Sequence, residues 1–84
     1  MKRNHRHAYN ALKKIGCPVW TWGDDQENFN VDAESNHPTV WADYWSKDKD
    51  GWLFGVNPLI TEILDKYNLY AEWVNPGHLC VYNN

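Results

Sequence analysis

The sequence predicts an α+β domain: two helix–strand–strand units forming a mainly antiparallel four-stranded sheet with both helices on one face, plus a Trp-rich inserted segment. Three observations support this fold class. An apolar stripe with the helical i, i+3, i+4, i+7 spacing is repeated at an offset of 52 residues. Each stripe stops at a residue that tolerates the left-handed conformation ending many helices, Gly16 or Asn68. Each stop is followed by a strand-like run, a turn and a second strand.

The first helix is expected over residues 4–15, with Asn4 as its N-cap. Its apolar stripe consists of Ala8, Ala11, Leu12 and Ile15. Pro18 cannot continue a helix, so the chain should turn into a strand over 19–22.

An acidic turn over 23–27 leads to the second strand. Phe29 and Val31 alternate with polar residues over 28–32, which predicts a half-buried strand.

The inserted segment allows two interpretations. Pro38 suits the first turn of a helix extending to Trp45, and the spacing of four between Val40 and Tyr44 favours that helix. The alternative is a strand, because Thr, Val, Trp and Tyr all favour sheets. A charged loop follows over 46–51.

The second helix has clear start signals, because Asn57 can cap it and Pro58 fits its first position. Its stripe consists of Ile60, Ile63, Leu64 and Tyr67, and Glu62 and Lys66 form an i, i+4 pair on its wet side.

The last two strands flank Asn75-Pro76-Gly77, which predicts a type II turn. The register of this hairpin stays open. A slip of one residue would exchange the face that holds Ala71 and Trp73 for the face that holds Tyr70, Glu72 and Val74.

Length and composition bound the function. The 84 residues make one domain, divided into units 1–32 and 56–84 around the insertion 33–55. A net charge of −3 argues against a general nucleic-acid binder. There is no apolar run near 18 residues, so no membrane span is expected. A cytoplasmic location is the default, in which Cys17 and Cys80 would be reduced.

The sequence contains none of the standard catalytic signatures, and we expect neither an enzyme nor a cofactor. Residues 46–57 echo a calcium-binding loop, but Ser46 and Asn57 stand where that loop needs carboxylates. The four histidines and two cysteines show no zinc spacing, so no metal site is expected.

Several segments resemble small uncharacterised proteins encoded by tailed bacteriophages. The segments are Trp41-Ala42-Asp43-Tyr44-Trp45, Gly55-Val56-Asn57-Pro58, Ala71-Glu72-Trp73-Val74-Asn75-Pro76-Gly77 and Ala11-Leu12-Lys13-Lys14-Ile15-Gly16. The resemblance implies a location in the host cytoplasm and an accessory role, commonly that of binding and modifying a host or phage protein. It brings no catalytic residues with it.

The first functional hypothesis is a non-enzymatic protein that binds a host or phage protein, for example to inhibit a host defence or metabolic complex. Six Trp, five Tyr and two Phe exceed what so small a core needs, although core packing is the competing interpretation. The expected anchors are Trp41, Trp45 and Trp52, with Asp43, Asp48 and Asp50 as a charged rim. The alternative is a small nucleic-acid-associated module that uses the basic N-terminus and exposed aromatics.

Overall fold

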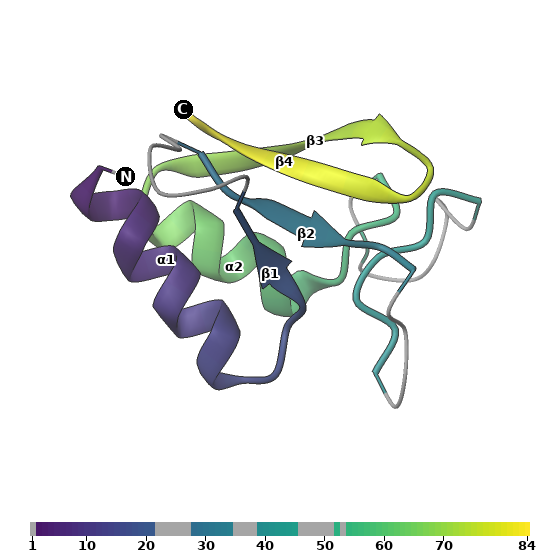
Figure 1. Cartoon of the computed structure of the whole chain (residues 1–84), viewed down its shortest axis with the longest axis horizontal. Helices are drawn as coiled ribbons and strands as arrows, with labels where there is room; N and C mark the ends of the chain where they lie inside the picture. The colour runs from purple at the N-terminus through teal and green to yellow at the C-terminus, as the bar shows by residue number, and fades with distance from the viewer. Residues whose placement is uncertain (1, 22–27, 35–38, 46–51, 53) are drawn as a thin grey trace.

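The computed structural model describes residues 2–21, 28–34, 39–45, 52 and 54–84 (Figure 1). Its elements, in order, are α1 (Arg3–Lys14), β1 (Val19–Trp20), β2 (Asn30–Asp32), α2 (Pro58–Lys66), β3 (Leu69–Asn75) and β4 (His78–Asn83). Two helices and a four-stranded antiparallel sheet confirm the predicted α+β class.

The strand order is β1-β2-β4-β3, and every neighbouring pair is antiparallel. The pairs β1–β2 and β3–β4 are the two expected strand pairs. They join through β2 and β4, where Val31 lies opposite Leu79. The two outer strands of the sheet are therefore β1 and β3.

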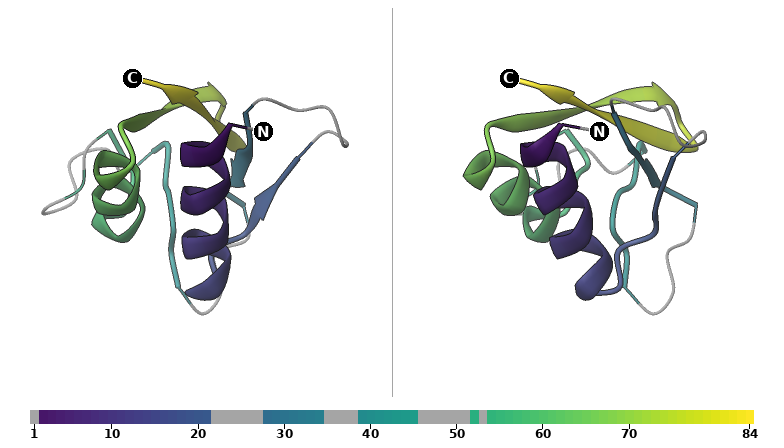
Figure 2. Two further views of the ribbon diagram at one scale, coloured as in Figure 1. Left: turned by 90° about the vertical axis from the view of Figure 1, so that its left-hand side faces the viewer. Right: turned by 60° about the vertical axis from the view of Figure 1, so that its left-hand side comes forward.

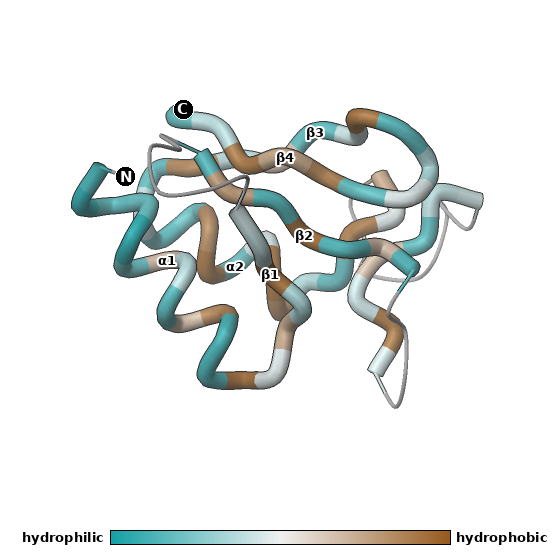
Figure 3. The backbone as a smooth tube through the Cα atoms, viewed as in Figure 1, coloured by the Kyte–Doolittle hydropathy of each residue, from teal (hydrophilic) through white to brown (hydrophobic). Residues whose placement is uncertain are grey.

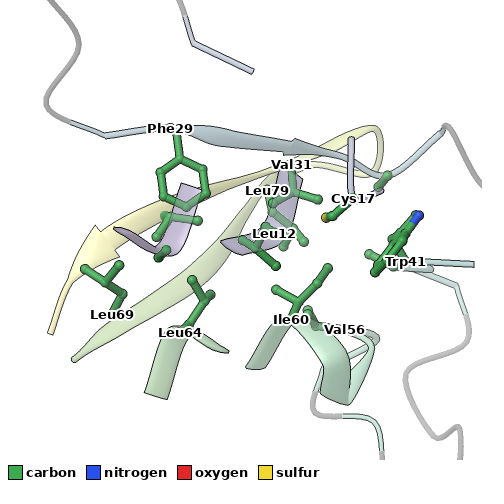
Figure 4. Close-up of a cluster of buried hydrophobic side chains, with 14 residues drawn as sticks. Leu12, Cys17, Phe29, Val31, Trp41, Val56, Ile60, Leu64, Leu69 and Leu79 are labelled. Carbon is green, nitrogen blue, oxygen red and sulfur yellow. The ribbon is translucent and has the colours of Figure 1, made fainter. Parts of the chain in front are cut away.

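Both helices lie side by side on the same face of the sheet (Figure 2). The core fills the space between them and the strands (Figure 4). Its buried side chains come from both helices, from β2, β3 and β4, and from the segment around Trp41, whereas β1 contributes only the partly buried Val19. Its largest fully buried apolar members are Phe29, Leu12, Ile60, Leu64, Leu69 and Leu79. Brown, hydrophobic positions along α1 and α2 accordingly alternate with teal ones in Figure 3.

The start of α1 differs from the prediction. The N-cap is Lys2, and Asn4 lies inside the helix. The Asn4 amide instead donates to the carbonyl oxygen of Tyr67 at 3.1 Å and to Oδ1 of Asn83 at 2.9 Å. Asn4 thus ties α1 to the end of α2 and to the end of β4, a tertiary role that a local capping rule does not predict.

The buried stripe of α1 is also displaced toward the N-terminus. Its buried members are His5, Ala8 and Leu12, whereas Ile15, which was expected in the stripe, is 44% exposed. A ring contact with Phe29, with centroids 6.3 Å apart, accommodates His5 among apolar neighbours.

The helix ends follow the expected chemistry. The Asn57 side chain accepts a hydrogen bond from the Leu59 N–H at 2.9 Å, and Pro58 occupies the first turn of α2. Gly16 and Asn68 adopt φ values of +90° and +58°, as the left-handed stops require.

The register of the β3–β4 hairpin is settled by burial. Leu69, Ala71 and Trp73 point toward the helices, whereas Tyr70 and Glu72 are exposed on the opposite face. The turn is not of type II, because Gly77 does not have a positive φ. The Asn75 side chain shapes it instead, accepting from the Gly77 N–H at 2.7 Å in an Asx turn.

The helix preferred for residues 38–45 is wrong over 39–45, the part that the structure describes. This segment runs beside the start of α2, where Ala42 forms an isolated antiparallel bridge with Val56. Asn57 donates from Nδ2 to the carbonyl oxygen of Val40 at 3.0 Å, and its N–H bonds to the Trp41 carbonyl. These contacts with a distant part of the chain replace the bonds that a local helix would make.

Candidate functional site

A partly open groove of about 510 Å³ lies between α2 and the outer strand β3. Its volume falls within the roughly 300–1,000 Å³ of typical ligand pockets. Ten residues line it: Phe54, Val56, Thr61, Leu64, Asp65, Leu69, Tyr70, Ala71, Glu72 and Trp73. We call this feature the α2–β3 groove.

The groove follows from how α2 packs on the sheet. Leu64 and Leu69 are buried in the core and form the apolar floor together with Val56. Thr61 and Asp65 are one helical turn apart and form the helix wall. The opposite wall is the continuous run of β3 from Leu69 to Trp73, so the groove follows the strand for most of its length.

An unusual turn closes one end of the groove. Phe54 and Gly55 both have positive φ, at +53° and +80°. A Cβ on Gly55 would collide with the carbonyl oxygen of Asp43, so only glycine fits there. The turn is held by the Trp73 indole, whose Nε1–H donates to the Phe54 carbonyl oxygen at 2.8 Å.

The strained backbone presents an aromatic ring to solvent, because the Phe54 side chain is 73% exposed. A non-glycine residue in the left-handed region costs free energy, and such strain is concentrated at functional sites. Exposure and strain together single out Phe54.

Four aromatic residues are linked near this end of the groove by ring contacts and by the Trp73–Phe54 hydrogen bond. We call them the aromatic rim: Tyr44, Trp45, Phe54 and Trp73. The Tyr44 ring contacts the rings of Trp73 and Trp45 edge-on, at centroid distances of 5.3 and 5.1 Å. Trp45 is 80% exposed, the largest value among the exposed apolar side chains of the described residues.

The structure separates the three predicted Trp anchors. Trp41 is only 5% exposed and belongs to the core, so the expectation that it is an exposed anchor is wrong. Trp45 is exposed as expected and belongs to the aromatic rim, whereas Trp52 is half-buried. The insertion therefore contributes to the core as well as to the surface, because Ala33 and Ala42 are buried too.

Of the predicted charged rim, only Asp43 lies in the described part of the chain. Its side chain accepts from the Trp45 N–H at 3.0 Å and fixes the backbone that presents this Trp. Asp48 and Asp50 lie outside the described residues.

The sequence analysis did not identify Phe54 or Trp73 as site residues. The dipeptide Phe54-Gly55 was a usable indication of a turn with positive φ. Trp73 could not be placed, because the hairpin register was open.

Charge is segregated along the chain. Residues 2–14 contain five Lys and Arg and no Asp or Glu, so all 11 acidic residues belong to the rest of the chain. Of the two acidic residues that line the α2–β3 groove, Asp65 belongs to the helix wall, whereas Glu72 lies on the strand wall with its side chain on the exposed face of the sheet. The groove is thus an apolar channel with an acidic residue on its helix wall, distinct from the basic surface of α1.

Neither metal-ion nor thiol chemistry is visible in the parts of the chain that the structure describes. No three His, Cys, Asp or Glu side chains there come together in an arrangement suited to a metal ion. Cys17 and Cys80 are free, and burial raises the pKa of the Cys17 thiol to about 12, so this thiol stays protonated and unreactive. Neither described helix has the length and apolar character to cross a membrane.

No family model, curated protein or solved structure matches this chain. The case for a function therefore depends on the geometry of the α2–β3 groove and the aromatic rim.

Proposed function

We propose that this protein is a non-enzymatic accessory protein that binds another protein through the aromatic rim and the adjoining α2–β3 groove. The observation that carries the proposal is the position of this rim, held by the Trp73–Phe54 hydrogen bond beside an apolar groove. Exposed aromatic side chains next to a concave apolar surface are the typical anchors of protein interfaces.

The partner is expected to present a basic surface. Asp65 places a carboxylate on the helix wall of the groove, and Asp43 lies beside Trp45. Opposite charges at the edge of an interface accelerate association and orient the partners. The resemblance to small phage proteins suggests a host or phage protein in the host cytoplasm, and inhibition of a host complex is the role we propose.

Capture from a bacterial lysate tests this proposal when it is done with a matched pair of variants. Trp45→Ala removes the most exposed aromatic ring of the described residues. Tyr82→Ala is the control, because Tyr82 on β4 does not line the groove and lies opposite Tyr70, on the face of the sheet away from the helices. We expect Trp45→Ala to weaken capture of a specific protein by roughly 2 kcal/mol or more, on the order of interface hot spots. Equal capture by the wild type and by both variants would contradict the proposal.

The basic surface of α1 supports a second candidate function, that of a small nucleic-acid-associated module. Arg3, Arg6 and Lys14 are exposed on one face of the helix, together with His7 and Asn10. Binding through these groups would release counterions and fall steeply as salt increases. A fluorescent single-stranded oligonucleotide tests this directly, because absence of binding at low salt, or binding that Arg3→Glu/Arg6→Glu leaves unchanged, would exclude the module.

A further inference from the structure

The hydrogen-bond pattern shows which backbone groups of β3 face away from the sheet. Successive residues of an antiparallel strand direct their N–H and C=O groups alternately toward one neighbour and then the other. The Asn84 N–H donates to Asn68 at 3.0 Å, and the register pairs Tyr70 with Tyr82 and Glu72 with Cys80. By alternation, Tyr70 and Glu72 exchange their backbone bonds with β4, and Ala71 and Trp73 direct theirs outward.

The pairing of β4 with β2 independently gives the same alternation of backbone directions. The Val81 N–H donates to the carbonyl oxygen of Phe29 at 2.9 Å, so Val81 bonds toward β2. Its neighbours Cys80 and Tyr82 must then bond toward β3, as the first argument requires.

Ala71 and Trp73, whose backbone groups face outward, also line the α2–β3 groove. Both are half-buried, and within the described part of the chain no hydrogen bond reaches the backbone of either residue from outside the sheet. An outer strand with free backbone groups is a template for pairing with another strand. Here that template has an apolar groove immediately beside it.

We propose that the α2–β3 groove binds an extended peptide segment that adds to β3 as a fifth strand. This proposal rests on the function proposed above and specifies the shape of the partner. Backbone bonds to Ala71 and Trp73 would supply affinity, and every second side chain of the peptide would enter the groove over Val56 and Leu64. The shift in register between Trp73 and Asn75 limits the pairing at one end.

The charges and the packing identify the peptide. Asp65 places a carboxylate on the helix wall, and none of the described residues that line the groove is Lys or Arg, so the segment should carry Lys or Arg among its apolar residues. A second copy of this chain fits less well. Its β3 carries the acidic Glu72 and no Lys or Arg, and its own Leu69 and Trp73 are already packed against its own core.

A random display library of peptides of about ten residues, panned on the full chain, tests the proposal. We expect enriched sequences with alternating apolar residues and an excess of Lys and Arg. Ala71→Pro should weaken binding of a synthetic peptide with an enriched sequence at least about tenfold. The fold should survive, because the lost N–H points away from β4. Tyr70→Pro is the matched control, because it removes a bond to β4 and should unfold the hairpin.

A second variant and a direct measurement keep the test decisive if Ala71→Pro does not fold. Thr61→Arg places a long cationic side chain at the helix wall and should also abolish peptide binding. In the wild type, amide hydrogen exchange at Ala71 and Trp73 should slow when the peptide binds. Peptides that bind Ala71→Pro as well as the wild type, or that leave both amides unprotected, would overturn strand addition. So would a failure to enrich any peptide, or a wild-type dimer that Ala71→Pro separates into monomers.

The two proposals fail in different ways. Loss of lysate capture in Trp45→Ala, with unchanged capture in Ala71→Pro, would retain the rim as an interface and reject strand addition. Unchanged capture in both variants would reject the rim and the added strand together.

Discussion

The indole of Trp73 on β3 is hydrogen-bonded to the backbone of Phe54, 19 positions earlier in the chain, at an Nε1–O distance of 2.8 Å. This bond fixes the end of the α2–β3 groove to the outer strand of the sheet. It also holds the exposed Phe54 ring in a conformation that an isolated turn would rarely adopt.

Trp73→Phe should therefore destabilise the protein and weaken partner binding together. The lost hydrogen bond is worth about 0.5–1.5 kcal/mol, and the smaller ring removes part of the contact with Tyr44. Denaturant unfolding measures the first effect. Trp45→Phe is the control and should change stability by less than about 0.5 kcal/mol, because Trp45 is 80% exposed.

Two glycines with positive φ should respond differently to alanine. Gly16→Ala should cost only the backbone penalty, about 1–2 kcal/mol, because nothing lies within 4 Å of the added Cβ. Gly55→Ala adds a collision with the Asp43 carbonyl and should cost clearly more. Thermal unfolding of both variants measures the two losses of stability. Equal losses would show that the Phe54–Gly55 turn can shift away from the Asp43 carbonyl at no further cost.

Leucine-to-alanine changes within α2 test the packing of the helix on the sheet. Leu64 is 2% exposed, so Leu64→Ala should cost about 2–5 kcal/mol. Leu59, on the same helix, is 48% exposed, and Leu59→Ala should cost much less. An unmoved unfolding midpoint for Leu64→Ala would contradict the assigned core.

The Cys17 thiol should make stability fall in alkaline solution. Burial raises its pKa from 9.0 to about 12, so above pH 9 the unfolded chain loses this proton while the folded chain keeps it. The unfolded state then binds fewer protons, and the free energy of unfolding decreases as pH rises from 9 toward 12. Cys17→Ala should lack this part of the decrease. An identical pH profile in the variant would show that the thiol is not buried in solution.

Local chemistry explains which elements the sequence could predict. The start of α2 was predictable because Asn57 and Pro58 act within one turn, and the stop at Gly16 depends only on its own backbone. The segment 39–45 was not predictable in this way. Its conformation depends on Asn57, which bonds to Val40 and Trp41 across the fold.

The candidate site was predictable only in part, for the same physical reason. Trp45 was identified as exposed, but Trp41, four residues earlier, is core, and composition cannot distinguish the two. The groove depends on the register of β3, which places Trp73 toward the helices and Glu72 on the other face. Because both faces of that strand carry apolar residues, tertiary pairing alone selects the register.

Hydrogen–deuterium exchange of the full chain, with and without the protein that it captures from a lysate, tests the central claim most directly. We expect slower exchange in the Phe54–Gly55 turn, in α2 around Thr61 and at Ala71 and Trp73, with no change in the exposed face of α1. Protection confined to α1, with unchanged exchange along β3, would contradict this account and favour the basic surface as the binding site.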